Sequence, residues 1–360
     1  MHVPAPRAAL VEVDPTSLST PAREALEGVD RILVHHLPMV TRFRRVTARD
    51  GILLHGPAGW GEAAPFWDYD AVESSAWLAA AIQEATRPAP LPVRAEVPVN
   101  VTIPVCSSED AARRVRHSGG CTTAKVKVAD PGTALAEDVE RVAAVREALQ
   151  ETVGAAARIR VDANAAWTLP QAVEAIRALD DAAGGLEYVE QPCASVEELA
   201  RVRRRVDVPI AADESIRRAE DPLAVARAGA ADIAVVKVAP LGGVTRALQI
   251  AHDTGLEVVI SSALESSVGL AAGVRAAAAL PELRHACGLA TAQLLAADVT
   301  EQPLLPLGGA LAVREVAPEE SLVGAHPLPD GLEERWRDRL EAMCQALLAH
   351  SAGAGRGNAR

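Results

Sequence analysis

The chain has 360 residues, of which 49% are hydrophobic and 23% charged, and it carries a formal net charge of −12. This composition is typical of a globular protein, and the length indicates either two domains or one large barrel with additions. The negative charge argues against general nucleic-acid binding. The arginines of residues 201–208 (RVRRRVDV) alternate with apolar residues, so we expect them on the solvated face of a helix.

The cysteines are odd in number, lie far apart and form no C-x-x-C motif: Cys106, Cys121, Cys193, Cys287 and Cys344. This usage favours free thiols in a reducing compartment. No stretch is long and apolar enough to span a membrane, and the first residues do not resemble a signal peptide. We therefore expect a cytoplasmic protein that acts on a small molecule. The oligomeric state is left open, with a monomer as one option.

The N-terminal third is predicted to be a small α+β unit that follows a short extension. Residues 1–30 are rich in Pro, Ala and Thr, and we expect them to be a disordered extension. Residues 31–40 alternate like a strand, and residues 42–66 contain the Asp-Gly and glycine signals of hairpins and loops. Residues 70–86 have helical periodicity, and the prolines of residues 87–92 end it. Residues 31–92 therefore form the predicted unit.

A different pattern begins near residue 97. Short Val- and Ile-rich runs alternate with helical segments at 97–105, 123–129, 158–165, 186–192, 208–215, 232–240, 257–266 and 286–291. This alternation predicts a (β/α)8-type barrel or its seven-helix variant. A doubly wound sheet shows the same alternation, but no G-x-G-x-x-G follows an early strand, which weakens that alternative.

The C-terminal region differs from the repeated pattern. We place the barrel at residues 97–292 and expect an amphipathic helix over residues 330–350. The last ten residues, 351–360, are small and polar, and we expect them to be disordered.

Charged residues lie where the predicted barrel strands end. Lys125 and Lys127 are two positions apart on the second strand, so their side chains share one face. The next strands end with acids, and the sixth carries another lysine: Asp162, Glu190, Asp213 and Lys237. The carboxyl ends of barrel strands open at one mouth. We therefore expect these side chains to converge there.

The residue types indicate a chemistry. Three carboxylates in a small volume repel one another, and a hard divalent cation relieves that repulsion. Oxygen ligands favour Mg²⁺, so Asp162, Glu190 and Asp213 are the candidate metal ligands. Lys127 and Lys237 would then lie on opposite sides of the ion, where a lysine with a lowered pKa can act as a general base. The set predicts removal of a proton next to a carboxylate, with stabilisation of the resulting dianion.

Each of these residues also has an ordinary structural explanation. The two lysines of the second strand would serve equally as a solvated strand edge. Asp162 is compatible with an Asx-turn, and Glu190 with a helix cap. Their repeated occurrence at strand ends is what favours a site.

The ordered set resembles the muconate-lactonising-enzyme subgroup of the enolase superfamily. It comprises the K-x-K pair, Asp162 with Asn164 two residues on, Glu190 in EQP, Asp213 in DES, and Lys237. The resemblance covers roughly residues 31–325. It implies a modified TIM barrel, (β/α)7β, under an α+β capping domain built from residues 31–92 and completed by residues 300–350.

Within that subgroup, three segments resemble the o-succinylbenzoate synthases: residues 261–267 (SSALESS), 286–291 (ACGLAT) and 42–54. This resemblance implies Mg²⁺-dependent dehydration of 2-succinyl-6-hydroxy-2,4-cyclohexadiene-1-carboxylate in menaquinone biosynthesis. Lys127 would remove the α-proton and then assist departure of the hydroxyl group. Lys237 would stabilise the anionic intermediate by charge and cation–π contact.

The same resemblance implies the substrate pocket. Lys125 would hold a substrate carboxylate, and Asn164, Ser262 and the backbone around Gly288 would line the pocket. Glu214, next to Asp213, is expected in an outer shell, paired with Lys237 or Lys125.

Other activities fit the same residues. An N-succinylamino acid racemase would use the two opposing lysines as its bases, alone or beside the dehydration. Muconate cycloisomerase is a further alternative, whereas a dipeptide epimerase would want acids in residues 286–291, and none is present. A catalytically inactive, ligand-binding barrel is the alternative outside enzymes.

Overall fold

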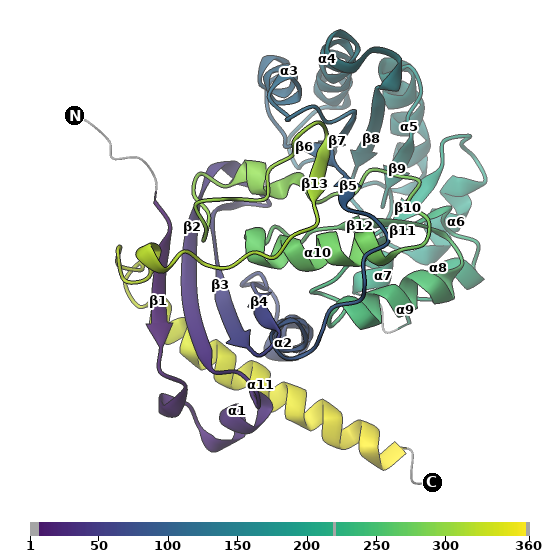
Figure 1. The fold of residues 1–360 in the computed structure, drawn as a ribbon. Coiled ribbons are helices and arrows are strands. Elements are labelled where there is room, and N and C mark those ends of the chain that lie inside the picture. Colours follow the sequence, from purple (N-terminus) through teal and green to yellow (C-terminus); the bar gives the residue numbers. More distant parts are fainter. Residues whose placement is uncertain (1–6, 219–220, 358–360) are drawn as a thin grey trace.

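The computed structural model describes residues 7–218 and 221–357, which form an antiparallel sheet with its helices beside a curled parallel sheet (Figure 1). The antiparallel sheet has the order β1-β2-β3-β4. Its strands are β1 (Ala9–Val13), β2 (Arg31–Phe43), β3 (Val46–Gly56) and β4 (Gly59–Ala63). The helices that pack with it are α1 (Thr20–Ala25), α2 (Ala71–Thr86) and α11 (Leu332–Gly357).

One apolar core joins this sheet to its helices and defines the capping domain. Trp77 of α2 and Trp336 of α11 are buried in it beside Ile52 and Leu54 of β3. Helix α2 begins where expected, because the side chain of Asp70 accepts a hydrogen bond from the backbone N–H of Glu73. Distant parts of the chain therefore share a single core.

The ends of the chain differ from the expectation. Residues 9–13 are not a disordered extension: β1 pairs with β2 from Ala9↔His36 to Val13↔Ile32, because its apolar residues cover the sheet edge. Residues 1–6 lie outside the described part. Helix α11 continues to Gly357, through most of the segment expected to be disordered, and residues 358–360 again lie outside the described part.

The segment before α11 also differs from the expectation that residues 300–350 belong to the capping domain. Strand β13 (Ala310–Ala312) pairs with β5 (Glu96–Pro98), and Leu304 and Leu311 are buried in the core around the parallel sheet. The C-terminal residues that are fully buried in the core of the capping domain lie mostly from Leu332 onward, with Leu294 before them and Leu328 partly buried against the same core. Apolar side chains at 304 and 311 thus hold this segment against the barrel.

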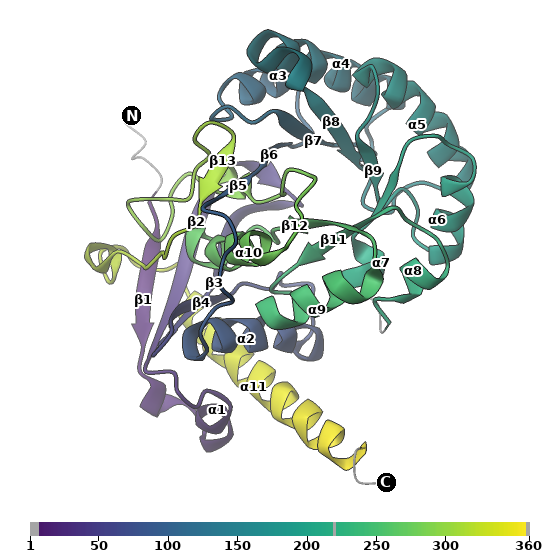
Figure 2. The same ribbon diagram turned by 45° about the vertical axis from the view of Figure 1, so that its right-hand side comes forward.

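The parallel sheet contains seven strands in the order β12-β11-β10-β9-β8-β7-β6. The strands are β6 (Asn100–Ile103), β7 (Thr123–Lys127), β8 (Arg158–Asp162), β9 (Tyr188–Glu190), β10 (Ile210–Ala212), β11 (Ile233–Lys237) and β12 (Glu257–Ser261). Figure 2 shows α4, α5, α6 and α8 along the outer side of the curled sheet. The helices between the strands are α3 (Ser108–Arg116), α4 (Leu135–Val153), α5 (Leu169–Ala183), α6 (Val196–Arg203), α7 (Glu214–Arg217), α8 (Ala224–Arg227), α9 (Val244–Thr254) and α10 (Ser267–Ala279).

Residues 286–288 close the sheet into a barrel. Cys287 forms a parallel bridge with Val99, and Gly288 forms one with Ser261 of β12. The backbone N–H of Gly288 donates to Ile260 at 2.8 Å, and that of Asn100 donates to Cys287 at 3.0 Å. The predicted (β/α)7β barrel is confirmed, with an eighth strand reduced to these bridges. The expected helix over 201–208 is shorter, because α6 ends at Arg203.

Short 3-10 helices complete the described structure at Pro15–Ser17, Gly154–Ala156, Ala290–Leu294 and Glu320–Leu322. Among the residues that the structure describes, no helix is long and apolar enough to cross a membrane.

A buried polar network lies beside residues 286–288, the segment that closes the barrel. Arg160 is fully buried and donates hydrogen bonds to Glu187, to the Tyr188 hydroxyl at 2.9 Å and to the carbonyl of Ala286 at 2.8 Å. The ring nitrogens of His285 lie 2.8 Å from a carboxylate oxygen of Glu187 and 2.8 Å from one of Glu257. An imidazole between two carboxylates favours its protonated form. The network ties the closing segment to β9 and β12.

This geometry predicts a pH-dependent contribution of His285 to stability. The hydrogen bond with Glu187 raises the pKa of His285 above its ordinary 6.5. The contribution is therefore complete below about pH 6.5 and is lost as the pH rises through the folded-state pKa. We expect His285→Asn to lower the free energy of unfolding more at pH 6 than at pH 9, measured by urea titration. His252→Asn, at an exposed ring beside Asp253, is the control and should show little change. An equal loss for His285→Asn at both pH values would contradict the charged-imidazole assignment.

Candidate active site

The two lysines of β7 point into the barrel rather than toward solvent. The strand register pairs Lys127 with Asp162 on β8 and Asp162 with Glu190 on β9, so these three residues lie at one level across adjacent strands. Lys125, two positions earlier, faces the same way and is 6% exposed. The interpretation of this pair as a solvated strand edge is therefore wrong.

The amines pair with the carboxylates of the next two strands. The Nζ of Lys125 lies 3.1 Å from both carboxylate oxygens of Glu190 and 3.2 Å from Oδ2 of Asp162. The Nζ of Lys127 donates to the same Oδ2 and, at 2.8 Å, to Oδ1 of Asn164. Asp162 and Glu190 are almost fully buried. Each charge in this half of the site has a direct partner.

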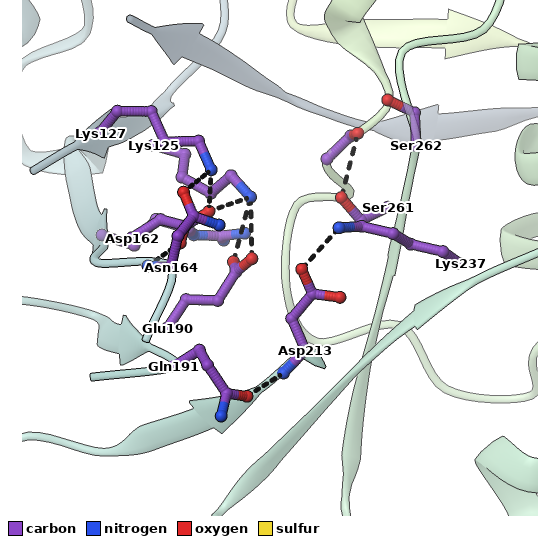
Figure 3. Close-up of polar contacts among 12 residues, drawn as sticks. Lys125, Lys127, Asp162, Asn164, Glu190, Gln191, Asp213, Lys237, Ser261 and Ser262 are labelled. Atoms are coloured by element: carbon purple, nitrogen blue, oxygen red, sulfur yellow. Dashed lines mark hydrogen bonds and ion pairs between the residues drawn. The ribbon is translucent and has the colours of Figure 1, made fainter. Parts of the chain in front are cut away.

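Asp213 and Lys237 form the other half of the site. Asp213 follows β10, and its Oδ2 lies 2.5 Å from Nζ of Lys237 on β11. The amide oxygen of Gln191 accepts the backbone N–H of Asp213 at 3.0 Å, which fixes the loop after β10 against the loop after β9. Figure 3 shows Lys127 and Lys237 entering from opposite sides of the group of carboxylates.

Burial and these pairings set the acidities of the groups. Burial and the neighbouring Asp162 raise the pKa of Glu190 to about 7. Although burial opposes it, Lys127 holds the pKa of Asp162 well below its usual range, and Lys237 does the same for Asp213. Burial, with the like charge of Lys125, lowers the pKa of Lys127. By contrast, Glu190 and Asp162 raise the pKa of Lys125 in spite of its burial. Lys127 is thus the better base of the two.

A small hollow opens beside these groups, and residues predicted to contact substrate line it. They are Lys125, Asn164, Ser262 and Gly288, beside Lys127 and Lys237. The Ser262 hydroxyl lies 2.7 Å from that of Thr291. A Cβ on Gly288 would lie 2.5 Å from the Ser261 hydroxyl, so glycine permits the close approach of this segment to β12. The roles of these residues toward substrate stay predictions.

The carboxylates suit a divalent metal ion in their chemistry. Asp162, Glu190 and Asp213 offer only oxygen atoms. Burial raises the pKa of Glu190, and the negative charges of Asp162 and Asp213 raise it further, a repulsion that a cation relieves. Within residues 7–218 and 221–357, no three His, Cys, Asp or Glu side chains are arranged as a metal-binding cluster. Lysine amines contact carboxylate oxygens of Asp162, Glu190 and Asp213 instead. The assignment of the three ligands therefore stays a prediction.

The expectation that Glu214 pairs with Lys237 or Lys125 is wrong. Its Oε1 lies 2.7 Å from Arg217 and 3.3 Å from the side-chain nitrogen of Asn164, and neither Lys237 nor Lys125 contacts it. Glu214 opens the short helix α7, so its side chain turns toward Arg217 three residues on.

Sequence reasoning missed several residues around the hollow. Thr102 lines it and lies opposite Lys125 in the register of β6 with β7. The sequence offered one signal, since Asn100 and Thr102 are polar residues two positions apart within the apolar run of residues 97–105 and so share one strand face. Phe43 and Arg44, at the turn between β2 and β3, also line it. Their position depends on how the capping domain rests on the barrel, which no local pattern reveals.

Comparison with known proteins places the chain in a family. Residues 107–318 match the model of enolase C-terminal domain-like proteins, and residues 34–85 match the enolase N-terminal domain-like model. The o-succinylbenzoate synthase of Mycolicibacterium smegmatis is 53% identical over 90% of this chain and 98% of its own length. That of Thermobifida fusca is 56% identical over 85% and 93%. The chain belongs to the o-succinylbenzoate synthase family of the enolase superfamily. The resemblance stated from the ordered lysines and acids is therefore confirmed.

Solved structures share the fold of this o-succinylbenzoate synthase family member. A muconate lactonizing enzyme from Pseudomonas fluorescens, complexed with muconolactone, matches with a TM-score of 0.67 at 22% identity over 83% of this chain and 98% of its own. A dipeptide epimerase from Enterococcus faecalis, complexed with Mg and L-Leu-L-Tyr, matches with a TM-score of 0.66 at 23% identity over 81% and 98%. Members of this superfamily use a divalent metal.

The pairing of Lys125 gives a prediction about stability. Lys125→Met leaves Glu190 and Asp162 with less positive charge, so we expect the free energy of unfolding to fall by about 3–5 kcal/mol without added metal. A divalent cation replaces the lost charge, so Mg²⁺ should raise the melting temperature of the variant more than that of the parent. Arg116→Met, which breaks an exposed pair with Glu151, is the control and should cost less than about 1 kcal/mol. An equal response of Lys125→Met and parent to Mg²⁺ would contradict the crowding of the carboxylates.

Proposed function

We propose that the protein is a Mg²⁺-dependent o-succinylbenzoate synthase. It would convert 2-succinyl-6-hydroxy-2,4-cyclohexadiene-1-carboxylate to o-succinylbenzoate and water in menaquinone biosynthesis. The observation that carries the proposal is the position of Lys127 and Lys237 on opposite sides of Asp162, Glu190 and Asp213, in a chain more than half identical to synthases of that name. As a carbon–oxygen lyase, it needs a base and an acid on one face of the ring.

Lys127 supplies both functions in this proposal. Its amine removes the proton next to the ring carboxylate, which is favoured because burial lowers the pKa of Lys127. The resulting ammonium then donates that proton to the departing hydroxyl group, so water leaves and the ring becomes aromatic. Asn164 accepts a hydrogen bond from the Lys127 amine at 2.8 Å and so directs it toward the hollow.

Lys237 stabilises the anion that forms between these two steps. Its amine enters from β11, opposite Lys127, and its contact with Asp213 keeps it in place at 2.5 Å. Its positive charge over the ring lowers the energy of the intermediate. Lys125, Ser262 and Gly288 are proposed to position the substrate in the hollow.

Asp162, Glu190 and Asp213 are proposed to hold Mg²⁺. When bound, the ion draws negative charge from the substrate carboxylate and so favours loss of the neighbouring proton. The carboxylates meet the oxygen-ligand preference of Mg²⁺, and their burial excludes bulk water from the charges.

Replacement of either amine tests the two lysine roles. Lys127→Ala and Lys237→Ala should each lower kcat for the dehydration by at least about a hundredfold, because each removes a group acting on the reacting atoms. The assay follows product absorbance, and circular dichroism checks that the variants fold. Appreciable turnover by either folded variant would exclude its role.

A racemase activity has one observation in its favour, since amines on opposite sides of a substrate are the arrangement for two-base racemisation. The parent protein is therefore assayed with N-succinyl amino acids in parallel, by polarimetry. Dehydration alone supports the synthase, both reactions indicate a bifunctional enzyme, and racemisation alone excludes the synthase. Absence of both reactions would favour a ligand-binding barrel.

Removal of metal gives a further prediction. EDTA should stop the dehydration, and Mg²⁺ or Mn²⁺ should restore it, because the dianion is not stabilised without the cation. Asp213→Asn should raise the metal concentration required for half-maximal activity. Full activity in metal-free buffer would show that the carboxylates serve another purpose.

The expected cytoplasmic location stays a prediction.

A further inference from the structure

Arg217, at the end of the short helix α7, contacts three polar groups at once. Its Nε lies 3.0 Å from Oδ1 of Asp213, and one terminal nitrogen lies 2.7 Å from Oε1 of Glu214. The other terminal nitrogen donates to the hydroxyl of Tyr69 at 3.0 Å. The guanidinium group therefore joins a carboxylate of the candidate active site to a residue of the capping domain.

The contacts of Arg217 occur in a closed environment. Its side chain is 2% exposed, and that of Asp213 is 1% exposed. Tyr69 is buried in the core of the capping domain, with its ring 5.2 Å from that of Trp77. Hydrogen bonds of charged groups in such surroundings are strong and directional. The position of the Asp213 carboxylate thus depends on the seating of the capping domain.

The two oxygens of Asp213 are divided between the two sides of the site. Oδ1 accepts from Arg217, and Oδ2 contacts Lys237. With Oδ1 held by a planar guanidinium, the carboxylate is oriented and Oδ2 is turned toward the space between the opposing lysines. Glu214 extends this link to Asn164, which in turn contacts Lys127.

We propose that Arg217 and Tyr69 are positioning residues that orient Asp213 for the metal ion and couple this orientation to the docking of the capping domain. The inference rests on the proposed function in one respect, since it takes Asp213 as a metal ligand. Neither residue contacts the substrate hollow, so both act through Asp213.

The direction of the expected effect separates positioning from simple charge. A guanidinium that acted only as a nearby positive charge would repel the metal, and its removal would tighten metal binding. A guanidinium that orients a ligand has the opposite effect, and loss of such outer contacts typically weakens metal binding by about 10–100-fold. The two explanations thus predict shifts of opposite sign.

The experiment measures Mn²⁺ dissociation constants by electron paramagnetic resonance, without substrate, for the full-length parent, Arg217→Ala, Tyr69→Phe and Arg218→Ala. Arg218 is the matched control, because it is the next residue, carries the same charge and lies 5.0 Å from the Tyr69 ring, yet it is itself exposed and pairs with partly exposed Glu73. We expect Arg217→Ala to weaken Mn²⁺ binding at least about tenfold. Tyr69→Phe should weaken it by a smaller factor, and Arg218→Ala should leave it unchanged.

Chemical rescue provides a second readout. Guanidinium at non-denaturing concentrations should restore part of the Mn²⁺ affinity of Arg217→Ala and should not change that of Arg218→Ala. Unchanged or tighter Mn²⁺ binding by Arg217→Ala overturns the proposal. If that variant does not fold, an unchanged affinity in Tyr69→Phe overturns the coupling to the capping domain.

These outcomes are distinct from failure of the proposed function. Mn²⁺ binding needs no turnover, so a parent protein that binds Mn²⁺ without dehydrating the substrate still tests Arg217. A parent protein that binds no Mn²⁺ overturns both the metal role of Asp213 and the positioning role of Arg217.

Discussion

The balance between buried amines and buried carboxylates at the barrel mouth governs this site. An ionised group without a partner in such a place is costly, so each charge constrains its neighbours. Lys125 lies against both Glu190 and Asp162, and these carboxylates raise its pKa. Lys127 shares only one oxygen of Asp162, and burial beside Lys125 lowers its pKa. Two lysines on one strand face therefore have pKa values shifted in opposite directions, upward for Lys125 and downward for Lys127.

The pocket above these charges depends equally on the junction between capping domain and barrel. Glu62 of β4 accepts backbone hydrogen bonds from Ser266 and Gly269 at the start of α10, where the helix dipole favours a negative charge. Arg49 of β3 donates to the carbonyl of Leu264 at 3.0 Å. These contacts fix the segment that carries Ser262 into the hollow. The capping sheet thus sets the shape of the pocket wall through buried polar contacts, while the barrel strands carry the amines and acids.

Local patterns predicted the elements well where apolar periodicity and caps coincide. The strand runs ending at Asp162 and Glu190 and the helix after Asp70 were all visible in the sequence, because each has a clear period and a clear end. The same local patterns failed to predict features that depend on contacts between residues far apart in the sequence. Residues 9–13 looked like part of an extension, since their pairing with β2, from Ala9↔His36 to Val13↔Ile32, leaves no local trace. Arg217 was invisible for the same reason: its partner Tyr69 lies in the other domain.

The charged residues beside the hollow and the residues that cover it come from different parts of the structure. The amines and acids stand on or directly after barrel strands, whose spacing is fixed by continuous parallel hydrogen bonding. The capping domain contributes Phe43 and Arg44 to the lining of the hollow, from the turn between β2 and β3. In this turn Arg44 and Arg45 adopt positive φ angles of 47° and 68° although neither is glycine. Such a turn is held by its surroundings rather than by local preference, and Arg44 lies 4.9 Å from the Phe66 ring of the capping domain. Substitutions in this turn therefore reshape the space offered to a substrate while the charge balance beneath it stays intact.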